Sequence, residues 1–235
     1  MRLYNVPNYD EMCRKAAGLI SAQVILHPES VLGLATGSTP IGIYKRLAES
    51  HSRRELDFSG ITTFNLDEYC GLPTLDPQSY YYYMNKHLFS KVNIGDKAYL
   101  PCGTAPDLEL ECKRYEDLIA SCGGIDLQLL GIGDNGHIGF NEPSPVFEKY
   151  THCVTLDEKT VLANSRFFDS LEDVPKKALT MGIKTIMLAR KIVLVANGAG
   201  KKDILQKALY GPIAPAVPAS ILQLHPDVTV IWSEA

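Results

Sequence analysis

The 235-residue sequence contains no C-x-x-C pair and no zinc-finger spacing of cysteine and histidine, so nothing in it predicts a structural metal site. It also lacks a secretory signal, and a chain of this length without one is not expected to depend on disulfide bonds. We therefore expect reduced thiols at all six cysteines: Cys13, Cys70, Cys102, Cys112, Cys122 and Cys153.

No apolar run approaches the roughly 18 residues of a membrane-spanning helix, and the N-terminal MRLYNVPNYDEMCRKAAG lacks the apolar stretch of a signal peptide. The net charge of −4, with 21% charged residues, gives no indication of a nucleic-acid or anionic-membrane partner. An anionic small molecule is still allowed, because a local basic site can lie on an acidic protein. We expect a soluble, cytoplasmic protein.

What the sequence does contain is a regular alternation of apolar runs and amphipathic segments, within 46% hydrophobic residues. The β-branched runs are continuous rather than alternating, which is typical of strands buried on both faces of a parallel sheet. Strands are predicted at residues 31–36, 61–66, 126–132, 192–197 and 228–232, with shorter ones at 97–101 and 152–156.

Amphipathic segments predict helices between these strands. They cover residues 8–28, opened by Asn8 and Glu11 in capping-box spacing; residues 76–89, opened by Asp76 and Pro77; residues 107–122, capped by Asp107; and residues 198–211. This alternation predicts a single α/β domain over residues 1–235, with a mainly parallel β-sheet flanked by helices. The less regular stretch 144–190 is expected to be a lid-like insertion beside the sheet.

Four of the predicted strands run directly into polar, glycine-rich or charged sequence. VLGLAT leads to GSTP, ITTFNL to DEY, DLQLLGI to GDNGHIGFNEP, and IVLVAN to GAGKK. The carboxyl ends of parallel strands meet at one edge of a sheet, and ligands bind there in open α/β sheets. The sequence therefore predicts a ligand site where these four segments converge.

Two of the four segments suit an anion. In ATGSTP, Gly37 allows a tight turn, and Ser38 or Thr39 can cap the helix that follows; such a helix start presents free N–H groups to an anion. In GAGKK, Lys201 lies at a helix N-terminus, where its charge opposes the helix dipole, and a bound anion would explain its place. The alternatives are an ordinary capped turn and a solvated lysine pair.

The third segment, NLDEY, places Asp67 and Glu68 at the end of an apolar strand. A partly desolvated carboxylate at this position would have a raised pKa and could transfer a proton. The alternative is a carboxylate that caps a turn or a helix.

The fourth segment, GIGDNGHIGFNEP, has two incompatible interpretations. Its first three glycines spell the G-x-G-x-x-G of a dinucleotide-binding turn, but that turn must open a helix, and Gly139 with the following prolines breaks one here. What remains is a loop in which His137 lies five residues before Glu142. A carboxylate–imidazole pair across such a turn fixes the tautomer and raises the basicity of the histidine for acid/base work. A structural loop histidine is the alternative.

Taken in order, LGLATGSTP, TTFNLDEYCGL, LLGIGDNGHIGFNEP, ANSRFF and VPKKALTMG resemble the glucosamine-6-phosphate deaminase (glucosamine-6-phosphate isomerase) family. The likeness runs from about residue 31 to PASILQLHPDVTV near the C-terminus, and GHIGFNEP is its most specific motif. It implies a Rossmann-like parallel sheet and conversion of glucosamine 6-phosphate and water to fructose 6-phosphate and ammonia. It also implies that no metal or organic cofactor is used.

The resemblance assigns roles to individual residues. Asp67 matches the family's base, which moves a proton from C2 of the open-chain sugar to C1. His137 matches the residue that opens the pyranose ring, with Glu142 as its carboxylate partner. Asn135 belongs to the same ring-opening set, where some members carry Asp; an Asn can orient His137 by hydrogen bonding but cannot stabilise its protonated form by charge.

The resemblance extends the phosphate site to five residues: Gly37, Ser38, Thr39, Lys201 and, from NSRFF, Arg166. The guanidinium fork of an arginine suits a phosphate, and a lid position would make closure depend on the correct substrate. The run Tyr80–Tyr83 covers more than one helix face and is interpreted as packing.

The sequence departs from the hexameric, allosterically activated members of the family after the NEP loop. In place of their cationic and hydroxyl ligands stand Pro145, Val146, His152 and Val154. The longer C-terminal tail of those members is not present after Ala235. We therefore expect a monomer or a small homo-oligomer that an acetylated sugar phosphate does not activate.

Two other functions stay open. A 6-phosphogluconolactonase resembles this family in fold and in a G-x-G-x-x-G-H loop, but those hydrolases lack the FNEP continuation and usually carry Arg where this chain has Tyr69. A non-catalytic sugar-phosphate sensor would keep the phosphate site without the chemistry, but such domains come attached to a DNA-binding segment, and no helix-turn-helix or basic arm is visible. The deaminase is favoured over both.

Overall fold

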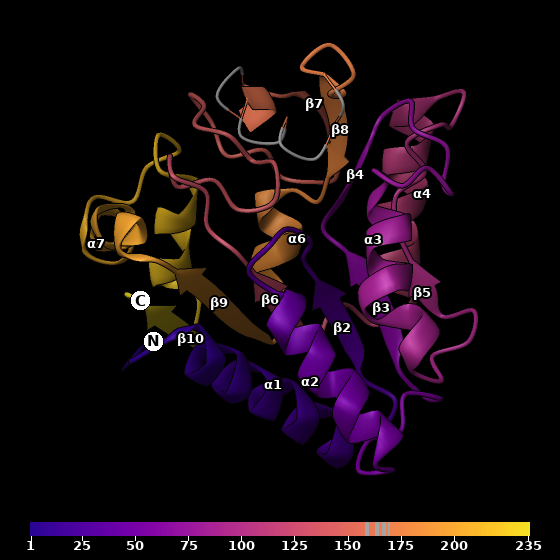
Figure 1. The fold of residues 1–235 in the computed structure, drawn as a ribbon. Coiled ribbons are helices and arrows are strands. Elements are labelled where there is room, and N and C mark those ends of the chain that lie inside the picture. The colour runs from indigo at the N-terminus through magenta and orange to yellow at the C-terminus, as the bar shows by residue number, and fades with distance from the viewer. Residues whose placement is uncertain (158–159, 163–164, 166–167, 169) are drawn as a thin grey trace.

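The computed structural model describes residues 1–157, 160–162, 165, 168 and 170–235, and a parallel sheet of seven strands lies at its centre (Figure 1). The order of strands across the sheet is β1-β10-β9-β6-β2-β3-β5, and all neighbours run parallel. The strands are β1 (Arg2–Val6), β2 (Val31–Leu34), β3 (Thr62–Asn65), β5 (Ala98–Tyr99), β6 (Leu127–Leu130), β9 (Lys191–Asn197) and β10 (Val228–Ser233).

Burial explains which strands the sequence predicts. Every residue of β2 and β6 is buried, because helices cover both faces of the sheet, and an unbroken apolar run is the signature of such a strand. All of the predicted strands are present. β1 was missed because it is the edge strand beyond β10 and only one of its residues, Val6, is buried.

Helices cover both faces of the sheet. One face carries α1 (Tyr9–Leu26), α2 (Ile41–Ser52) and α3 (Tyr80–His87). The other carries α4 (Leu108–Ser121), α6 (Ile183–Met187) and α7 (Lys202–Tyr210). Each face has its own apolar core, and successive strand residues alternate between the two, as Leu32 and Val31 do. Of the helices described, none is long and apolar enough to cross a membrane.

Most helix starts agree with the sequence. Asn8 caps α1 and Asp107 caps α4, each through a side-chain oxygen, as predicted. α3 begins later than predicted, at a cap formed by Ser79. Asp76 lies in the preceding turn, where its side chain accepts a hydrogen bond from the N–H of Gln78 (2.8 Å). The Asp-Pro pair therefore forms a local turn rather than the first turn of the helix.

A second, antiparallel sheet of three strands lies at the top of Figure 1, in the order β4 (Asp67–Tyr69), β8 (Lys177–Thr180), β7 (His152–Thr155). β4 follows directly from the carboxyl end of β3, whereas β7, β8 and α6 belong to the stretch 144–190. β8 and β7 therefore pack beside β4 as an elaboration beyond the carboxyl edge of the main sheet. β4 and β8 were not predicted, because they are short and carry charged residues.

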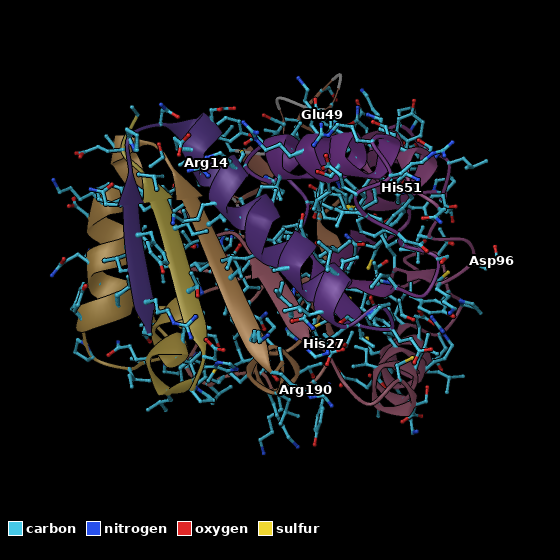
Figure 2. The ribbon with its side chains drawn as sticks, turned by 90° about the horizontal axis from the view of Figure 1, so that it is seen from below. Arg14, His27, Glu49, His51, Asp96 and Arg190 are labelled. Carbon is cyan, nitrogen blue, oxygen red and sulfur yellow. The ribbon has the colours of Figure 1, made fainter. Side chains whose placement is uncertain are left out.

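At the opposite edge of the main sheet, where the strands begin, an ion pair connects neighbouring strands. Figure 2, seen from below, shows Arg190 and His27 at this edge, shortly before β9 and β2. Arg190 forms an ion pair with Asp126, whose other carboxylate oxygen accepts the N–H of Val31 (2.8 Å). One carboxylate thus joins the starts of β2, β6 and β9, and the four polar segments singled out in the sequence lie at the other end of the strands.

Candidate active site

The four polar segments meet at the carboxyl edge of the main sheet, as predicted. β6 lies between β9 and β2, so the loop 131–142 after β6 is flanked by the segments that carry Lys201 and Gly37. Neighbouring strands are about 4.8 Å apart, which puts the starts of these two outer segments about 10 Å from each other. The fourth segment, with Asp67, follows β3 on the far side of β2.

Asp67 is buried where β3 passes into β4, with only 6% of its surface exposed. Burial, and secondly the nearby charge of Glu68, raises the pKa of Asp67 to about 8. No residue that the structure describes donates a hydrogen bond to its carboxyl group, so nothing offsets this rise. The predicted rise is therefore confirmed, and the ionised form is a stronger base than an ordinary aspartate.

Glu68, the second carboxylate of this pair, accepts hydrogen bonds at the start of a helix, which was the alternative to proton transfer. Its carboxylate accepts the backbone N–H groups of Tyr69 (2.8 Å), Tyr80 (2.9 Å) and Tyr81 (2.9 Å). Burial raises the pKa of Glu68, and these three hydrogen bonds act against that rise. Glu68 thus ties the N-terminus of α3 to β4, while Asp67 beside it has no donor among the residues that the structure describes.

Gly139 brings the loop of His137 against Asp67. A Cβ atom on Gly139 would lie 2.9 Å from Oγ1 of Thr180 and 3.6 Å from Oδ2 of Asp67, and the residue has φ +60°. A larger residue would be strained at this φ and would press on Thr180, and its Cβ atom would be in van der Waals contact with Asp67. Asp67 and His137, which is two residues before Gly139, therefore lie on the same side of the molecule.

Residues 180 and 181 hold this arrangement together. Oγ1 of Thr180 accepts the N–H of Phe140 (2.9 Å), and the amide of Asn141 donates to the carbonyl of Met181 (2.9 Å). The N–H of Met181 in turn donates to the carbonyl of Leu66 (2.7 Å). No local sequence pattern indicates these contacts, because their partners are far apart along the chain.

The glycines of the fourth segment serve the histidine and not a cofactor. The imidazole of His137 lies over Gly133, where a Cβ atom would be 2.2 Å from the ring. Gly136 closes the intervening turn with φ +89°, its N–H donating to the carbonyl of Gly133 (3.0 Å). No helix opens at this turn in the described chain; an isolated bridge between Ile138 and Asn141 follows. The structure therefore also excludes the interpretation of this segment as a dinucleotide-binding turn.

His137 and Glu142 form the predicted pair. Nδ1 of His137 is 3.3 Å from Oε2 of Glu142, and both side chains are largely buried. The amide of Asn135 donates to the same oxygen (2.6 Å), and the hydroxyl of Thr160 donates to Oε1 (2.5 Å). Thr160 was not predicted, since nothing in the sequence relates it to Glu142.

Asn135 orients the loop rather than the ring. The expected hydrogen bond between Asn135 and His137 is present: the side-chain oxygen of Asn135 accepts the backbone N–H of His137 (3.1 Å). The carboxylate of Glu142 is the imidazole's partner instead. Burial alone would raise the pKa of Glu142, but the hydrogen bonds and charge of His137, with the donors Thr160 and Asn135, outweigh it and lower the pKa overall. Glu142 is thus held ionised beside His137.

The turn after β2 differs from its prediction in one respect. Gly37 has φ +97°, as a tight turn requires. The N-cap of α2 is Pro40, however, and no side chain of the turn caps the helix. The expectation that Ser38 or Thr39 would cap it is therefore wrong. The hydroxyl of Tyr9 has taken this place, since it accepts the N–H of Gly42 (2.9 Å).

Lys201 reaches across to the central loop. Its Nζ donates to the carbonyl of Ile132 (2.8 Å) and to the carboxylate of Asp134 (2.5 Å), and its side chain is 23% exposed. Lys202, next in the chain, is 64% exposed and pairs with Glu234 (3.6 Å). The alternative of a solvated lysine pair thus fits Lys202 but not Lys201.

The remaining predicted residue, Arg166, lies outside the described residues, and its place in the site stays a prediction. Within the described part of the chain, no group of three or more histidine, cysteine or acidic side chains is arranged to hold a metal ion.

Comparison with known proteins extends over nearly the whole chain. Residues 8–232 match the family of glucosamine-6-phosphate isomerases/6-phosphogluconolactonase. The chain belongs to this family. Within the family, it is 59% identical to glucosamine-6-phosphate deaminase of Lachnoclostridium phytofermentans over 232 residues, covering 98% of each chain. It is 57% identical to that of Clostridium botulinum strain Loch Maree, covering 98% of this chain and 95% of the other.

Solved structures of the family agree with the fold. A monomeric glucosamine-6-phosphate deaminase superimposes with a TM-score of 0.97 at 48% identity, covering 99% of this chain and 97% of the other. A 6-phosphogluconolactonase from Thermotoga maritima has a TM-score of 0.75 at 20% identity, covering 100% and 99%. The second likeness concerns the fold alone.

The contact between Gly133 and His137 predicts a local effect of one methyl group. Gly133→Ala should push the imidazole off its position beside Glu142 and destabilise the protein by about 1–3 kcal/mol. Gly131→Ala is the matched control, because a Cβ there meets no atom within 4 Å. The measurements are the NMR resonances of the His137 ring and urea unfolding; equal behaviour of the two variants would contradict the contact.

The raised pKa of Asp67 predicts a pH-dependent stability difference. Between its unfolded-state pKa of about 4 and its folded-state pKa of about 8, the folded protein holds a proton that the unfolded chain has lost. Asp67 therefore destabilises the fold increasingly as the pH rises through this window. Asp67→Asn should gain in free energy of unfolding relative to the wild type between pH 5 and pH 9, by at most ~5 kcal/mol. A difference that is constant with pH in urea titrations would refute the shift.

Proposed function

We propose that this chain is a glucosamine-6-phosphate deaminase, which converts glucosamine 6-phosphate and water to fructose 6-phosphate and ammonia. Relatives of this name are 57–59% identical over 98% of the chain. The observation that carries the proposal is the buried Asp67, with a pKa of about 8, next to the loop that holds the His137–Glu142 pair. A base and a separate proton-transfer pair on the same side of the molecule are what isomerisation of an amino sugar requires.

Ring opening is the first step and belongs to His137. Because the ionised Glu142 is the partner of Nδ1, the proton of the neutral imidazole is on Nδ1 and Nε2 carries the free electron pair. Nε2 takes the proton of the anomeric hydroxyl and returns it to the ring oxygen, which yields the open-chain aldehyde. Asn135 and Thr160 hold Glu142 in place for this exchange.

Asp67 performs the second step. Its carboxylate removes the proton from C2 of the open-chain sugar, which gives an enolamine, and then delivers it to C1, which gives an imine at C2. Over the two transfers the amino group releases one proton and O1 gains one, so the imine is an isomer of the amino aldose. Water adds to the imine and ammonia leaves, so a hydrolytic step follows the isomerisation. A pKa of about 8 suits this exchange, because the group both accepts and releases the same proton near neutral pH.

The phosphate group occupies the other end of the site. The turn Gly37, Ser38 and Thr39 supplies backbone N–H groups and hydroxyls, and Lys201 supplies a positive charge two strands away. Arg166 completes the set as a bidentate donor. Binding energy from this end, which does not react, holds C2 against Asp67.

A lactonase is less well supported. The Arg that usually follows the acidic pair in lactonases is replaced here by Tyr69, whose ring packs against Tyr80 and Phe140 with centroids 4.7 and 5.9 Å away. Phe140 itself belongs to the FNEP continuation that those enzymes lack. Tyr69 and Phe140, which both distinguish this chain from the lactonases, thus belong to one aromatic cluster.

We also propose that the protein acts as a monomer without an acetylated sugar phosphate as activator. A hollow of about 330 Å³ borders Glu142 on the side of residues 143–155. Val146, His152 and Val154 line it together with Glu148, and no lysine or arginine is among its described lining residues. A phosphate ester would find neither the guanidinium nor the ammonium group of a usual phosphate site among these residues.

The test of the proposed function is release of ammonia from glucosamine 6-phosphate by the purified protein in the presence of a chelator. Asp67→Asn should lower turnover at least about 1,000-fold, because the base is lost, while equilibrium binding of the sugar phosphate stays within about twofold. Acid production from 6-phosphogluconolactone with no ammonia from the amino sugar would favour the lactonase. Unchanged turnover of Asp67→Asn would remove it from the base role.

His137→Gln should affect ring opening alone. Turnover of the cyclic substrate is expected to fall about 100-fold or more, whereas an open-chain analogue, which bypasses this step, should lose much less. Steady-state rates on the two compounds measure the difference. Equal losses on both would mean that His137 acts after ring opening.

A further inference from the structure

The N-terminus of α2 is capped by a residue from another helix. The hydroxyl of Tyr9, at the start of α1, accepts the N–H of Gly42 (2.9 Å) and donates to the carbonyl of Thr39 (3.0 Å). It also lies 3.4 Å from the carbonyl oxygen of Ser38. α1 and α2 pack side by side (Figure 1), so this contact is part of a helix–helix interface.

A second tyrosine holds the same turn from the other side. The hydroxyl of Tyr83, on α3, donates to the carbonyl of Gly37 (2.6 Å). The interpretation of the run Tyr80–Tyr83 as packing alone is therefore incomplete. Two phenols from α1 and α3 fix successive carbonyl groups of one short turn.

These hydrogen bonds decide which groups of the turn face away from the phenols. In a planar trans peptide the C=O and the following N–H point in opposite directions. With the Gly37 carbonyl directed at Tyr83, the N–H of Ser38 points away from it. Within the described chain, the hydroxyls of Ser38 and Thr39 form no hydrogen bond, because Tyr9 performs the capping that they would otherwise provide.

We propose that Tyr9 and Tyr83 are positioning residues of the phosphate turn 37–39: their hydroxyls hold its carbonyl oxygens away from the phosphate and leave the N–H and hydroxyl groups free to bind it. This inference rests on the proposed function of the turn. It assigns to the two phenols an effect on the affinity for the phosphate group and none on the acid/base steps, because neither touches Asp67 or His137 in the described structure.

Two further observations agree with this role. A Cβ atom on Gly42 would lie 2.6 Å from Sγ of Cys13 and 3.0 Å from the Tyr9 hydroxyl, so only glycine admits Tyr9 at this distance. Burial raises the pKa of Tyr9 to about 12 and that of Tyr83 further still. Both phenols are therefore protonated near neutral pH, as donors to a carbonyl must be.

The experiment uses Tyr9→Phe, Tyr83→Phe and the double variant, with Tyr82→Phe as control. Tyr82 is the neighbour of Tyr83 on the same helix, is 38% exposed, and its hydroxyl has no partner in the described chain. Each of the first two variants should raise KM for glucosamine 6-phosphate about 2- to 10-fold with kcat within about twofold. Calorimetric titration with inorganic phosphate should show the same loss of affinity, and the control should show none.

The phosphate titration also separates this inference from the proposed function. If the wild type released no ammonia, the proposed deaminase function would be refuted. Weaker phosphate binding by the Phe variants would still support the proposal that Tyr9 and Tyr83 position the turn 37–39. In Gly42→Ala, the added Cβ atom would lie 3.0 Å from the Tyr9 hydroxyl and should displace it. This variant should therefore also weaken phosphate binding. Unchanged phosphate affinity and KM in both single variants, with only a lower melting temperature, would show that the phenols are structural and would overturn the proposal.

Discussion

The acid/base groups of this protein depend on one short pairing of strands, β4 with β8. It places Asp67 opposite Thr180, and Thr180 in turn accepts the N–H of Phe140 from the loop that carries His137 (2.9 Å). The next residue, Met181, bonds to Leu66 and to Asn141. Two segments that are distant in the sequence are thus attached to the same pair of residues, and these short hydrogen bonds to Thr180 and Met181 hold the His137 loop beside Asp67.

Three carboxyl groups near the site have three different roles because their surroundings differ. Glu68 accepts three backbone N–H groups and serves as a helix anchor. Glu142 is kept ionised by His137 and two neutral donors, and serves as a charge partner. Asp67 is buried without a donor among the described residues and has a pKa of about 8. The kind of hydrogen-bond donor, rather than the residue type, separates these roles: backbone N–H groups for Glu68, side chains that include an imidazole for Glu142, and none among the described residues for Asp67.

The sequence predicted the parts of the fold that burial dictates. Central strands such as β2 were found because both faces are covered, whereas the exposed edge strand β1 and the charged β4 carry no such pattern. Asp67 and His137 were found because they follow strands whose ends must converge. Thr160 and Tyr9 were not found, because their contacts join segments 18 and 33 residues apart, and no local rule relates such positions.

Contrary to what local sequence rules predict, the N-terminus of α2 is not capped by Ser38 or Thr39. A Ser or Thr before a helix normally uses its hydroxyl to cap the first turn, and here Tyr9 does so instead. The proposed mechanism explains this exchange, because Asp67 has no hydrogen-bond donor among the described residues, and binding energy from the phosphate end would bring it against C2. Hydroxyls that capped the helix could not also bind the phosphate. Rigidity supplied from α1 and α3 thus allows the turn to be both ordered and open to its ligand.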